Sequence, residues 1–186
     1  EQGERLALNG KNGSGKSSLL KLILGEDIKK TGTISIGSGL IISYVSQDTS
    51  HLSGTLSDYA SQCRIDESLF KAILRKLDFE RIQFTKDMAQ FSGGQKKKVL
   101  IAKSLCEQAH LYLWDEPLNF IDIYSRMQIE QLILDFRPTM IFVEHDRAFR
   151  ETIATKTLEL FWARLSQLFS LSIYYSIPIH HREEGR

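Results

Sequence analysis

Short apolar runs of strand length alternate with segments of helical periodicity along most of the chain. The predicted strands are residues 6–8, 33–36, 40–45, 111–114, 139–143 and 157–161. The predicted helices are residues 16–24, a segment capped by Asp66, a segment that follows Gly93-Gly94, residues 123–136 and residues 147–154. Strands and helices in alternation are typical of an α/β fold with a mainly parallel central sheet flanked by helices.

Helical spacing also predicts which side chains face the core. On the helix capped by Asp66, one face carries Leu69, Phe70, Ile73, Leu74 and Leu77. On the later helices, we expect inward positions for Val99, Ala102, Leu105, Ile129, Ile133 and Phe136. Residues 49–90 lack obvious core strands, so we expect a mainly helical insertion into the sheet domain.

The composition is that of an ordinary globular domain. The chain has 186 residues, of which 42% are hydrophobic and 25% charged, and these values exclude disorder and fibrous repeats. The net charge of +1 provides no global field for nucleic acid, which leaves only a local patch as an option. Cys63 and Cys106 are too few for a disulfide scaffold, so we expect reduced thiols in a cytoplasmic protein. Because the chain begins Glu1-Gln2-Gly3, without an initiator Met or a signal-peptide pattern, we expect a fragment of a longer protein.

One uncharged stretch raises the question of a membrane span. Residues 165–179 carry no charge, but they contain four Ser, one Gln and a Pro. A spanning helix needs about 20 apolar residues, which is longer than this stretch, so we expect no membrane insertion. Residues 162–186 are treated as a C-terminal tail of different composition. His180-His181 lie in this tail without further ligands nearby, and they predict no metal site.

A glycine-rich segment between the first predicted strand and the first predicted helix carries the strongest chemical signal. Residues 10–17 read Gly-Lys-Asn-Gly-Ser-Gly-Lys-Ser and fill every fixed position of the phosphate-binding pattern G-x-x-x-x-G-K-[ST]. Glycines let backbone N–H groups approach phosphate oxygens, and the following helix points its N-terminus at the same anion. Lys16 supplies a charge for the β- and γ-phosphates, and the Ser17 hydroxyl ligates Mg²⁺. The predicted contacts of a metal-bound triphosphate are Gly10, Lys11, Asn12, Gly13, Ser14, Gly15, Lys16, Ser17 and Ser18.

Two carboxylates end the predicted strand at residues 111–114. Ligands of open parallel sheets bind beyond the carboxyl ends of the strands, so we expect Asp115 and Glu116 to emerge beside the phosphates. Asp115 is the natural partner of Mg²⁺, and Glu116 is placed to orient or deprotonate an attacking water. The alternative is a pair of acids that simply end a strand in solvent, and the phosphate-binding segment upstream argues against it.

Further segments follow in an order that resembles the nucleotide-binding domain of ABC ATPases. Phe91-Ser92-Gly93-Gly94-Gln95 resembles the family's LSGGQ signature sequence, with Phe in place of Leu. Gln47 follows an apolar strand where the family has its Q-loop, residues 117–122 resemble the D-loop, and Val143-Glu144-His145-Asp146 resembles the switch histidine segment. The resemblance extends from residue 3 to about residue 160 and implies the fold of a P-loop NTPase with a helical signature subdomain.

The signature segment has a physical meaning of its own. A Ser hydroxyl and glycine amides at a helix start make an anion site. The predicted contacts of this site are Ser92, Gly93, Gly94 and Gln95. The resemblance implies that the site faces the γ-phosphate held by a second ABC domain, so that two domains sandwich each ATP. It implies the same partner for Asp122, which resembles the D-loop aspartate that communicates across the pair.

The resemblance also assigns the residues around the metal and the attacking water. It implies ATP and Mg²⁺ as the cofactors, with metal contacts from Ser17, Gln47 and Asp115. It implies ATP hydrolysis, with catalytic roles for Glu116, His145 and Gln47. Taken alone, Gln47 carries no meaning, and an imidazole such as His145 is more often solvated or satisfied by its neighbours than catalytic.

Details of the motifs favour one branch of the family. Asn12-Gly13 and Asn119 resemble the ABC-F branch, whose D-loop typically reads EPTNHLD, although this chain departs from that form at Leu118 and Phe120. The residues of the signature and D-loop segments resemble those in the second ATPase domain of antibiotic-resistance ABC-F proteins of the lincosamide, pleuromutilin and streptogramin A group. The resemblance implies a parent protein that binds the ribosome and releases the drug. The expected divisions are an ATP-binding domain at 1–161, a helical subdomain at about 49–107 and a tail at 162–186.

Other interpretations stay open at this point. The same motifs occur in ATPase subunits of ABC membrane transporters, and an isolated half domain that cannot complete its composite site could be catalytically silent. Lys96, Lys97 and Lys98 could touch RNA, although three lysines at a helix start are more often a solvated face.

Overall fold

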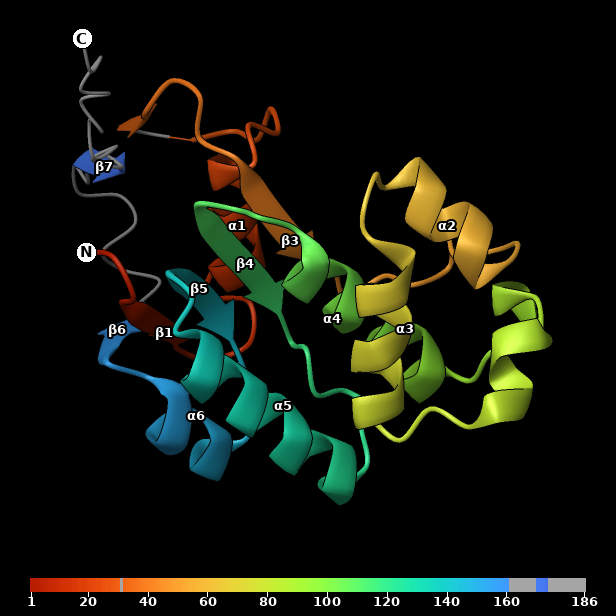
Figure 1. Cartoon of the computed structure of the whole chain (residues 1–186). Coiled ribbons are helices and arrows are strands. Elements are labelled where there is room, and N and C mark those ends of the chain that lie inside the picture. Colours follow the sequence, from red (N-terminus) through yellow and green to blue (C-terminus); the bar gives the residue numbers. More distant parts are fainter. Residues whose placement is uncertain (31, 161–169, 174–186) are drawn as a thin grey trace, which may run out of the picture.

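The computed structural model describes residues 1–30, 32–160 and 170–173, and a five-stranded sheet lies at its centre (Figure 1). Its strands are β1 (Arg5–Asn9), β3 (Ile42–Val45), β4 (Leu111–Asp115), β5 (Met140–Val143) and β6 (Lys156–Glu159). They follow the order β3-β4-β5-β1-β6, and every neighbouring pair runs parallel. The predicted parallel α/β fold is confirmed, and each strand overlaps a predicted apolar run.

Helices cover both faces of this sheet. Their bounds are α1 (Lys16–Ile23), α2 (Leu56–Gln62), α3 (Glu67–Lys76), α4 (Gly93–Cys106), α5 (Ile123–Phe136) and α6 (Arg147–Ile153), with 3₁₀ turns at η1 (Arg81–Thr85) and η2 (Met88–Gln90). In Figure 1, α1 lies behind the sheet, whereas α5 and α6 lie in front of it. A separate small sheet pairs β2 (Thr33–Ile36) in parallel with β7 (Ser170–Ile173). The strand predicted at 33–36 therefore forms, but outside the central sheet.

Alternate residues of each strand point to opposite faces of the sheet, and both faces are apolar. One face packs on α1, where Leu8 and Leu113 share a core with Leu20 and Ile23. The other face packs on α4, α5 and α6, and its buried side chains include Ala7, Tyr112, Trp114, Phe142, Ile129, Ile133, Phe149 and Ile153. Burial on both faces explains why β4 reads as an unbroken apolar run.

Residues 46–110, all of which are described, contain helices and turns but no strand. In this segment α3 packs beside both α2 and α4, and it buries Phe70, Ile73 and Leu74. The rings of Phe79 and Phe91 meet edge to face with centroids 5.3 Å apart, and both belong to the core that covers the sheet. The helical insertion expected between the strands therefore shares one hydrophobic core with them.

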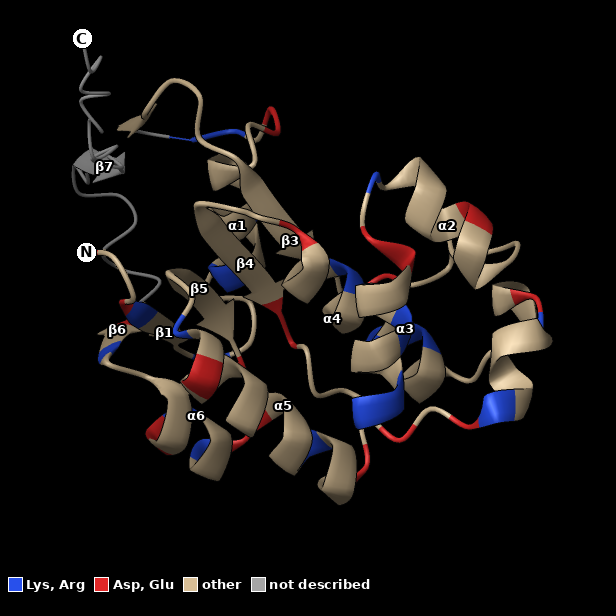
Figure 2. Ribbon diagram, in the orientation of Figure 1, with Lys and Arg blue, Asp and Glu red and all other residues tan. Residues whose placement is uncertain are grey.

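The carboxyl ends of four neighbouring strands lie at one edge of the sheet. The chain leaves β1 into the glycine-rich loop, leaves β3 toward Gln47, leaves β4 into Glu116 and leaves β5 into His145. Figure 2 shows acidic residues where β4 ends. Because parallel strands place their carboxyl ends together, residues far apart in the sequence meet at this edge.

Two expected core positions are wrong. Leu69 on α3 is 48% exposed, because the buried stripe of that helix runs through Phe70, Ile73 and Leu74 and leaves Leu69 on its flank. Phe136 is 55% exposed, because it is the last residue of α5 and reaches past the core. Its ring still contacts Tyr112 edge to face, with centroids 6.0 Å apart.

Both cysteines are free, as expected. Burial raises the pKa of the Cys106 thiol to about 12, and burial also raises the pKa of Cys63. Because the thiolate is the reactive form, both thiols are poorly disposed to react at neutral pH.

Most of the C-terminal tail lies outside the described residues. Within residues 1–30, 32–160 and 170–173, no helix has the length and apolar character that a bilayer span requires. Apart from β7, the uncharged stretch at 165–179 is not described, and neither is His180-His181.

The start of α3 provides a test of the local fold. The Asp66 carboxylate accepts a hydrogen bond of 2.6 Å from the Leu69 amide and so caps the helix. We expect Asp66→Ala to lower the free energy of unfolding by about 1 kcal/mol, because an orphan helix amide loses its acceptor. Asp66→Asn keeps an acceptor at the same place and is the matched control in urea unfolding. Equal stability of the two variants would contradict the capping role.

Candidate nucleotide-binding site

The loop between β1 and α1 is curled around a lysine. Gly10 has a φ of +145°, and a Cβ there would lie 2.6 Å from the backbone oxygen of Leu160, so a side chain does not fit. Gly15, with a φ of +93°, is the cap residue from which α1 begins. The Lys16 ammonium donates to the backbone oxygens of Gly10 at 2.8 Å and Lys11 at 3.1 Å, inside the loop. The first amides of α1 and a buried cation therefore face the same small volume.

The residues of this loop fit a phosphate group. The Ser14 hydroxyl is buried and has no hydrogen-bond partner among the residues that the structure describes. An orphaned hydroxyl is costly unless a ligand satisfies it. Together with the helix amides and the Lys16 ammonium it makes a donor set suited to phosphate oxygens.

Three predicted metal contacts converge beside this loop. The Asp115 carboxylate oxygen Oδ1 accepts hydrogen bonds from the Ser17 hydroxyl at 3.2 Å and from the Gln47 side-chain amide at 3.0 Å. The Gln47 amide lies 3.5 Å from the Ser17 hydroxyl. A hydroxyl and a carboxylate are hard oxygen ligands of the kind that Mg²⁺ takes when it also binds phosphates, and Gln47, which here donates through its side-chain nitrogen, also carries an amide oxygen. The cluster therefore fits that ion.

Glu116 and His145 form a pair next to the predicted metal contacts. Glu116 follows β4 with a φ of +48°, an unusual backbone conformation for a residue other than glycine. Its Oε1 lies 3.2 Å from the His145 ring nitrogen Nε2, and its Oε2 accepts a hydrogen bond of 2.7 Å from Asn119. The carboxylate is thus oriented by two neighbours and can accept a proton from a water near the loop.

The signature segment begins α4 with a complete capping box. The Ser92 hydroxyl accepts from the Gln95 amide, and the Gln95 side chain accepts from the Ser92 amide. Gly93 and Gly94 lie against Phe120 of the segment that resembles the D-loop. The structure therefore brings the predicted signature contacts together with the D-loop.

Asp122 ends the D-loop and caps α5. Its carboxylate accepts from the Ser125 amide at 2.8 Å and pairs with the Lys98 ammonium at 2.9 Å. Desolvation by burial pushes the pKa of Asp122 upward, but the Ser125 amide and Lys98 outweigh it and hold the pKa well below its usual range. Asp122 is therefore a charged link between α4 and α5.

The solvated face expected for Lys96, Lys97 and Lys98 is wrong for two of the three. Lys97 is 2% exposed and Lys98 is 8% exposed, so neither ammonium is open to RNA. The Lys97 ammonium donates to the Ser46 backbone oxygen at 2.8 Å, next to Gln47. Burial lowers the pKa of Lys97, and the carboxylates of Asp115, Glu116 and Glu144 oppose that shift.

Sequence reasoning missed Lys97 and Glu144 as parts of the site. Lys97 shares a helical face with Ile101 and Ser104, both buried, and that spacing is a signal that the charge run obscured. Glu144 directly follows a buried strand, as Glu116 follows β4. That shared position at the sheet edge could have identified Glu144.

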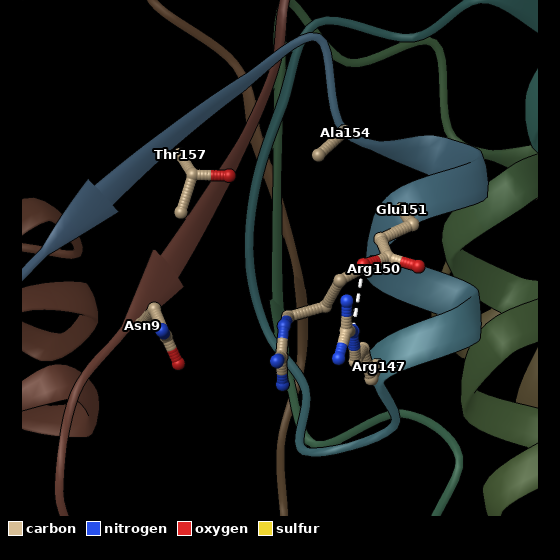
Figure 3. Close-up of a pocket in the computed structure, with 6 residues that line it drawn as sticks. All are labelled: Asn9, Arg147, Arg150, Glu151, Ala154 and Thr157. Atoms are coloured by element: carbon tan, nitrogen blue, oxygen red, sulfur yellow. Dashed lines mark hydrogen bonds and ion pairs between the residues drawn. The ribbon is translucent and has the colours of Figure 1, made fainter.

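A separate pocket of about 240 Å³ lies between α6 and the strands β1 and β6 (Figure 3). Its lining residues are Asn9, Arg147, Arg150, Glu151, Ala154 and Thr157. Arg150 extends from α6 into this space in Figure 3, and its guanidinium donates to the backbone oxygens of Glu144 and His145. The pocket therefore adjoins the switch segment.

Known proteins of one family are similar to this chain in sequence. A family profile described as ABC transporter matches residues 1–119. The chain belongs to this family. ABC-family domains bind ATP, and the hydrogen-bond donors of the glycine-rich loop suit its phosphate oxygens.

The relatives of this ABC domain are longer proteins. ATP-binding protein Uup of Caulobacter vibrioides is 33% identical over 86% of this chain and 28% of its own length. ABC transporter F family member 2 of Arabidopsis thaliana is 32% identical over 86% of this chain and 24% of its length, and ribosome protection protein VmlR of Bacillus subtilis is 29% identical over 85% and 29%. Among solved structures, RNase-L Inhibitor matches with a TM-score of 0.72 and 26% identity over 85% of this chain and 32% of that chain. The chain spans less than a third of the length of each of these proteins.

The two signature glycines give contrasting predictions. A Cβ on Gly94 would lie 2.4 Å from the Phe120 backbone oxygen, whereas a Cβ on Gly93 would meet only the Phe120 ring at 3.4 Å. We expect Gly94→Ala to cost about 1–3 kcal/mol of unfolding free energy, because backbone must move. Gly93→Ala is the control and should be neutral or stabilising, since alanine favours a helix. Urea unfolding measures both, and equal destabilisation would show that the D-loop does not pack on Gly94.

Proposed function

We propose that this ABC domain binds ATP with Mg²⁺ and hydrolyses it. The observation that carries the proposal is the meeting of Ser17, Gln47 and Asp115 beside the Lys16 loop, with the Glu116–His145 pair next to them. Phosphate donors, oxygen ligands for a divalent ion and a candidate base lie at one sheet edge, which is the set that phosphoryl transfer to water requires.

Each residue would have a distinct task. The Lys16 ammonium would exchange the backbone oxygens of Gly10 and Lys11 for phosphate oxygens, and the orphaned Ser14 hydroxyl would gain a partner. Ser17, Gln47 and Asp115 would hold Mg²⁺, which when bound neutralises charge on the phosphates. Glu116 would orient a water and accept its proton.

The Glu116 carboxylate needs a defined direction for this task. His145 and Asn119 fix its two oxygens, so the carboxylate cannot turn away without breaking both contacts. His145, whose ring contacts Glu116, would also contact the γ-phosphate. Positioning of this kind supplies a large part of the rate in phosphoryl transfer.

We further propose that hydrolysis needs a second ATP-binding domain. The signature helix start and the D-loop pack on one another, and Ser92, Gly93 and Phe120 are exposed. Amides and a hydroxyl at an exposed helix start can donate hydrogen bonds to an anion, which suits a nucleotide held by another domain. The length of the relatives, more than three times the matched segment, leaves room for such a domain.

The biological setting is also a proposal. The similarity to ribosome protection protein VmlR supports a cytoplasmic ABC-F protein that acts on the ribosome and confers antibiotic resistance. The divisions at 1–161, about 49–107 and 162–186 remain predictions.

Lys16 gives the first test of the proposed function. We expect Lys16→Ala to weaken binding of ATP by roughly tenfold or more, because a charged contact to phosphate is lost. Lys21→Ala is the matched control, since it removes an exposed lysine from the last turn of the same helix, α1. Titration of a fluorescent ATP analogue measures both affinities. An unchanged affinity of Lys16→Ala would contradict a role of the loop in nucleotide binding.

Glu116 gives the second test, in the longer protein that carries both proposed ATP-binding domains. We expect Glu116→Gln to lower the turnover of ATP by roughly 100-fold or more while ATP stays bound, because the general base is lost and the binding groups are intact. Glu80→Gln, at an exposed position before η1, is the control. Phosphate release and nucleotide retention are measured together. If Glu116→Gln still turns over ATP at the wild-type rate, Glu116 is not the general base.

A further inference from the structure

Glu144 is a buried carboxylate that binds two loops at once. It is 5% exposed and directly follows β5. Its Oε2 accepts a hydrogen bond of 3.1 Å from the Leu118 amide in the D-loop. Its Oε1 accepts from the amides of His145 at 2.6 Å and Asp146 at 3.2 Å. One side chain therefore holds the D-loop with one oxygen and the switch segment with the other.

These hydrogen bonds are strong and independent of the partners' side chains. A buried carboxylate that accepts from backbone amides makes charge-assisted hydrogen bonds, and losing one leaves a buried polar group unpaired. Lys97 adds a favourable field, since Glu144 is one of the carboxylates that act on its ammonium. The contact is thus a firm link between the backbones of two segments.

Glu144 is not needed to form the helix that follows it. Asp146 caps α6 by accepting from the Phe149 amide at 2.9 Å. Arg150 of α6 donates hydrogen bonds to the backbone oxygens of Glu144 and His145. The switch segment is therefore already anchored on α6, and Glu144 adds the connection to the D-loop.

The D-loop end of this connection is open to a neighbour. Phe120 is 84% exposed and has a φ of +66°, while its backbone oxygen packs on Gly94 of the signature helix. A partner domain that packs on Phe120 would displace the Leu118 backbone. The Leu118 amide is hydrogen-bonded to Glu144, which also accepts from the His145 amide. The His145 ring in turn contacts Glu116.

We propose that Glu144 is a positioning residue that couples the D-loop to the switch histidine. The proposal rests on the proposed function, because it gives contact with a second domain a route to the Glu116–His145 pair. Docking of that domain on the D-loop sets the position of Leu118, and Glu144 transmits this position to His145. Glu144 itself touches no reacting atom.

The link is tested first without any hydrolysis, by amide signals in the two-dimensional NMR spectrum of the chain. A glutamine amide has only one oxygen, so in Glu144→Gln either Leu118 or the His145–Asp146 pair must lose its acceptor. We expect the amide proton signals of Leu118 and His145 to shift and hydrogen exchange to accelerate at the segment that is released. Glu151→Gln, an exposed site on α6, is the control and should leave both signals in place.

The coupling itself is tested by a double-mutant cycle on the same signals. In the wild type, Phe120→Ala should shift the His145 signals, and in the Glu144→Gln background that shift should disappear. A His145 response to Phe120→Ala that is the same in both backgrounds overturns the proposal. If Glu144→Gln does not fold, Glu144→Asp replaces it, because it keeps both oxygens on a side chain one methylene shorter and should weaken the response.

The consequence for turnover is measured in the longer protein with both domains. We expect Glu144→Gln to lower kcat by roughly tenfold with the affinity for ATP unchanged, since a misplaced catalytic pair slows chemistry without weakening binding. Unchanged kcat, or a loss of affinity in proportion to kcat, overturns the positioning role. If the wild type does not hydrolyse ATP, the proposed function fails, while the NMR cycle still decides whether Glu144 couples the loops.

Discussion

The contact of Asp115 with Ser17 and Gln47 joins three segments that lie far apart in the sequence. It exists because β4 runs parallel between β3 and β5, in a register that sets Trp114 opposite Val45 and Asp115 opposite Val143. That register carries the end of β4 to the same edge as the end of β3 and the start of α1. Any shift of register by one residue would turn the Asp115 side chain to the other face and dissolve the cluster.

Charge balance at this edge depends on buried lysines. Asp115 ends β4, Glu116 follows it and Glu144 follows the neighbouring β5, and like charges at one sheet edge would repel without cations among them. Lys16 lies in the glycine-rich loop and Lys97 approaches from the signature helix, where burial lowers its pKa while the three carboxylates oppose that shift. Lys97 also donates a hydrogen bond to the Ser46 backbone oxygen, so α4, which carries the signature segment, is in direct contact with the Q-loop.

The strands of the central sheet, the helices other than α2 and the nucleotide loop could be predicted because each has a strong local signal, whereas α2 and β7 were not predicted as elements. Buried parallel strands read as apolar runs, and the glycine pattern of residues 10–17 has a direct chemical reason. Phe136 was predicted wrongly because periodicity cannot reveal where a helix extends past the core. The solvated face was wrong for Lys97 because three adjacent charges say nothing about which of them faces an acidic cluster. Glu144 was missed because its partners are backbone amides, which no residue type marks, and only its position after a buried strand was a signal.

The central claim, that the Lys16 loop and the Ser17, Gln47 and Asp115 cluster hold a nucleotide with its metal ion, is tested most directly by crystallography. The chain would be crystallised with Mn²⁺ and a non-hydrolysable ATP analogue, and the ion located by its anomalous scattering. We expect an anomalous peak in contact with the Ser17 hydroxyl and beside Asp115, with the β- and γ-phosphates inside the loop of residues 10–17. A nucleotide bound elsewhere, or an ion remote from Ser17 and Asp115, would contradict it.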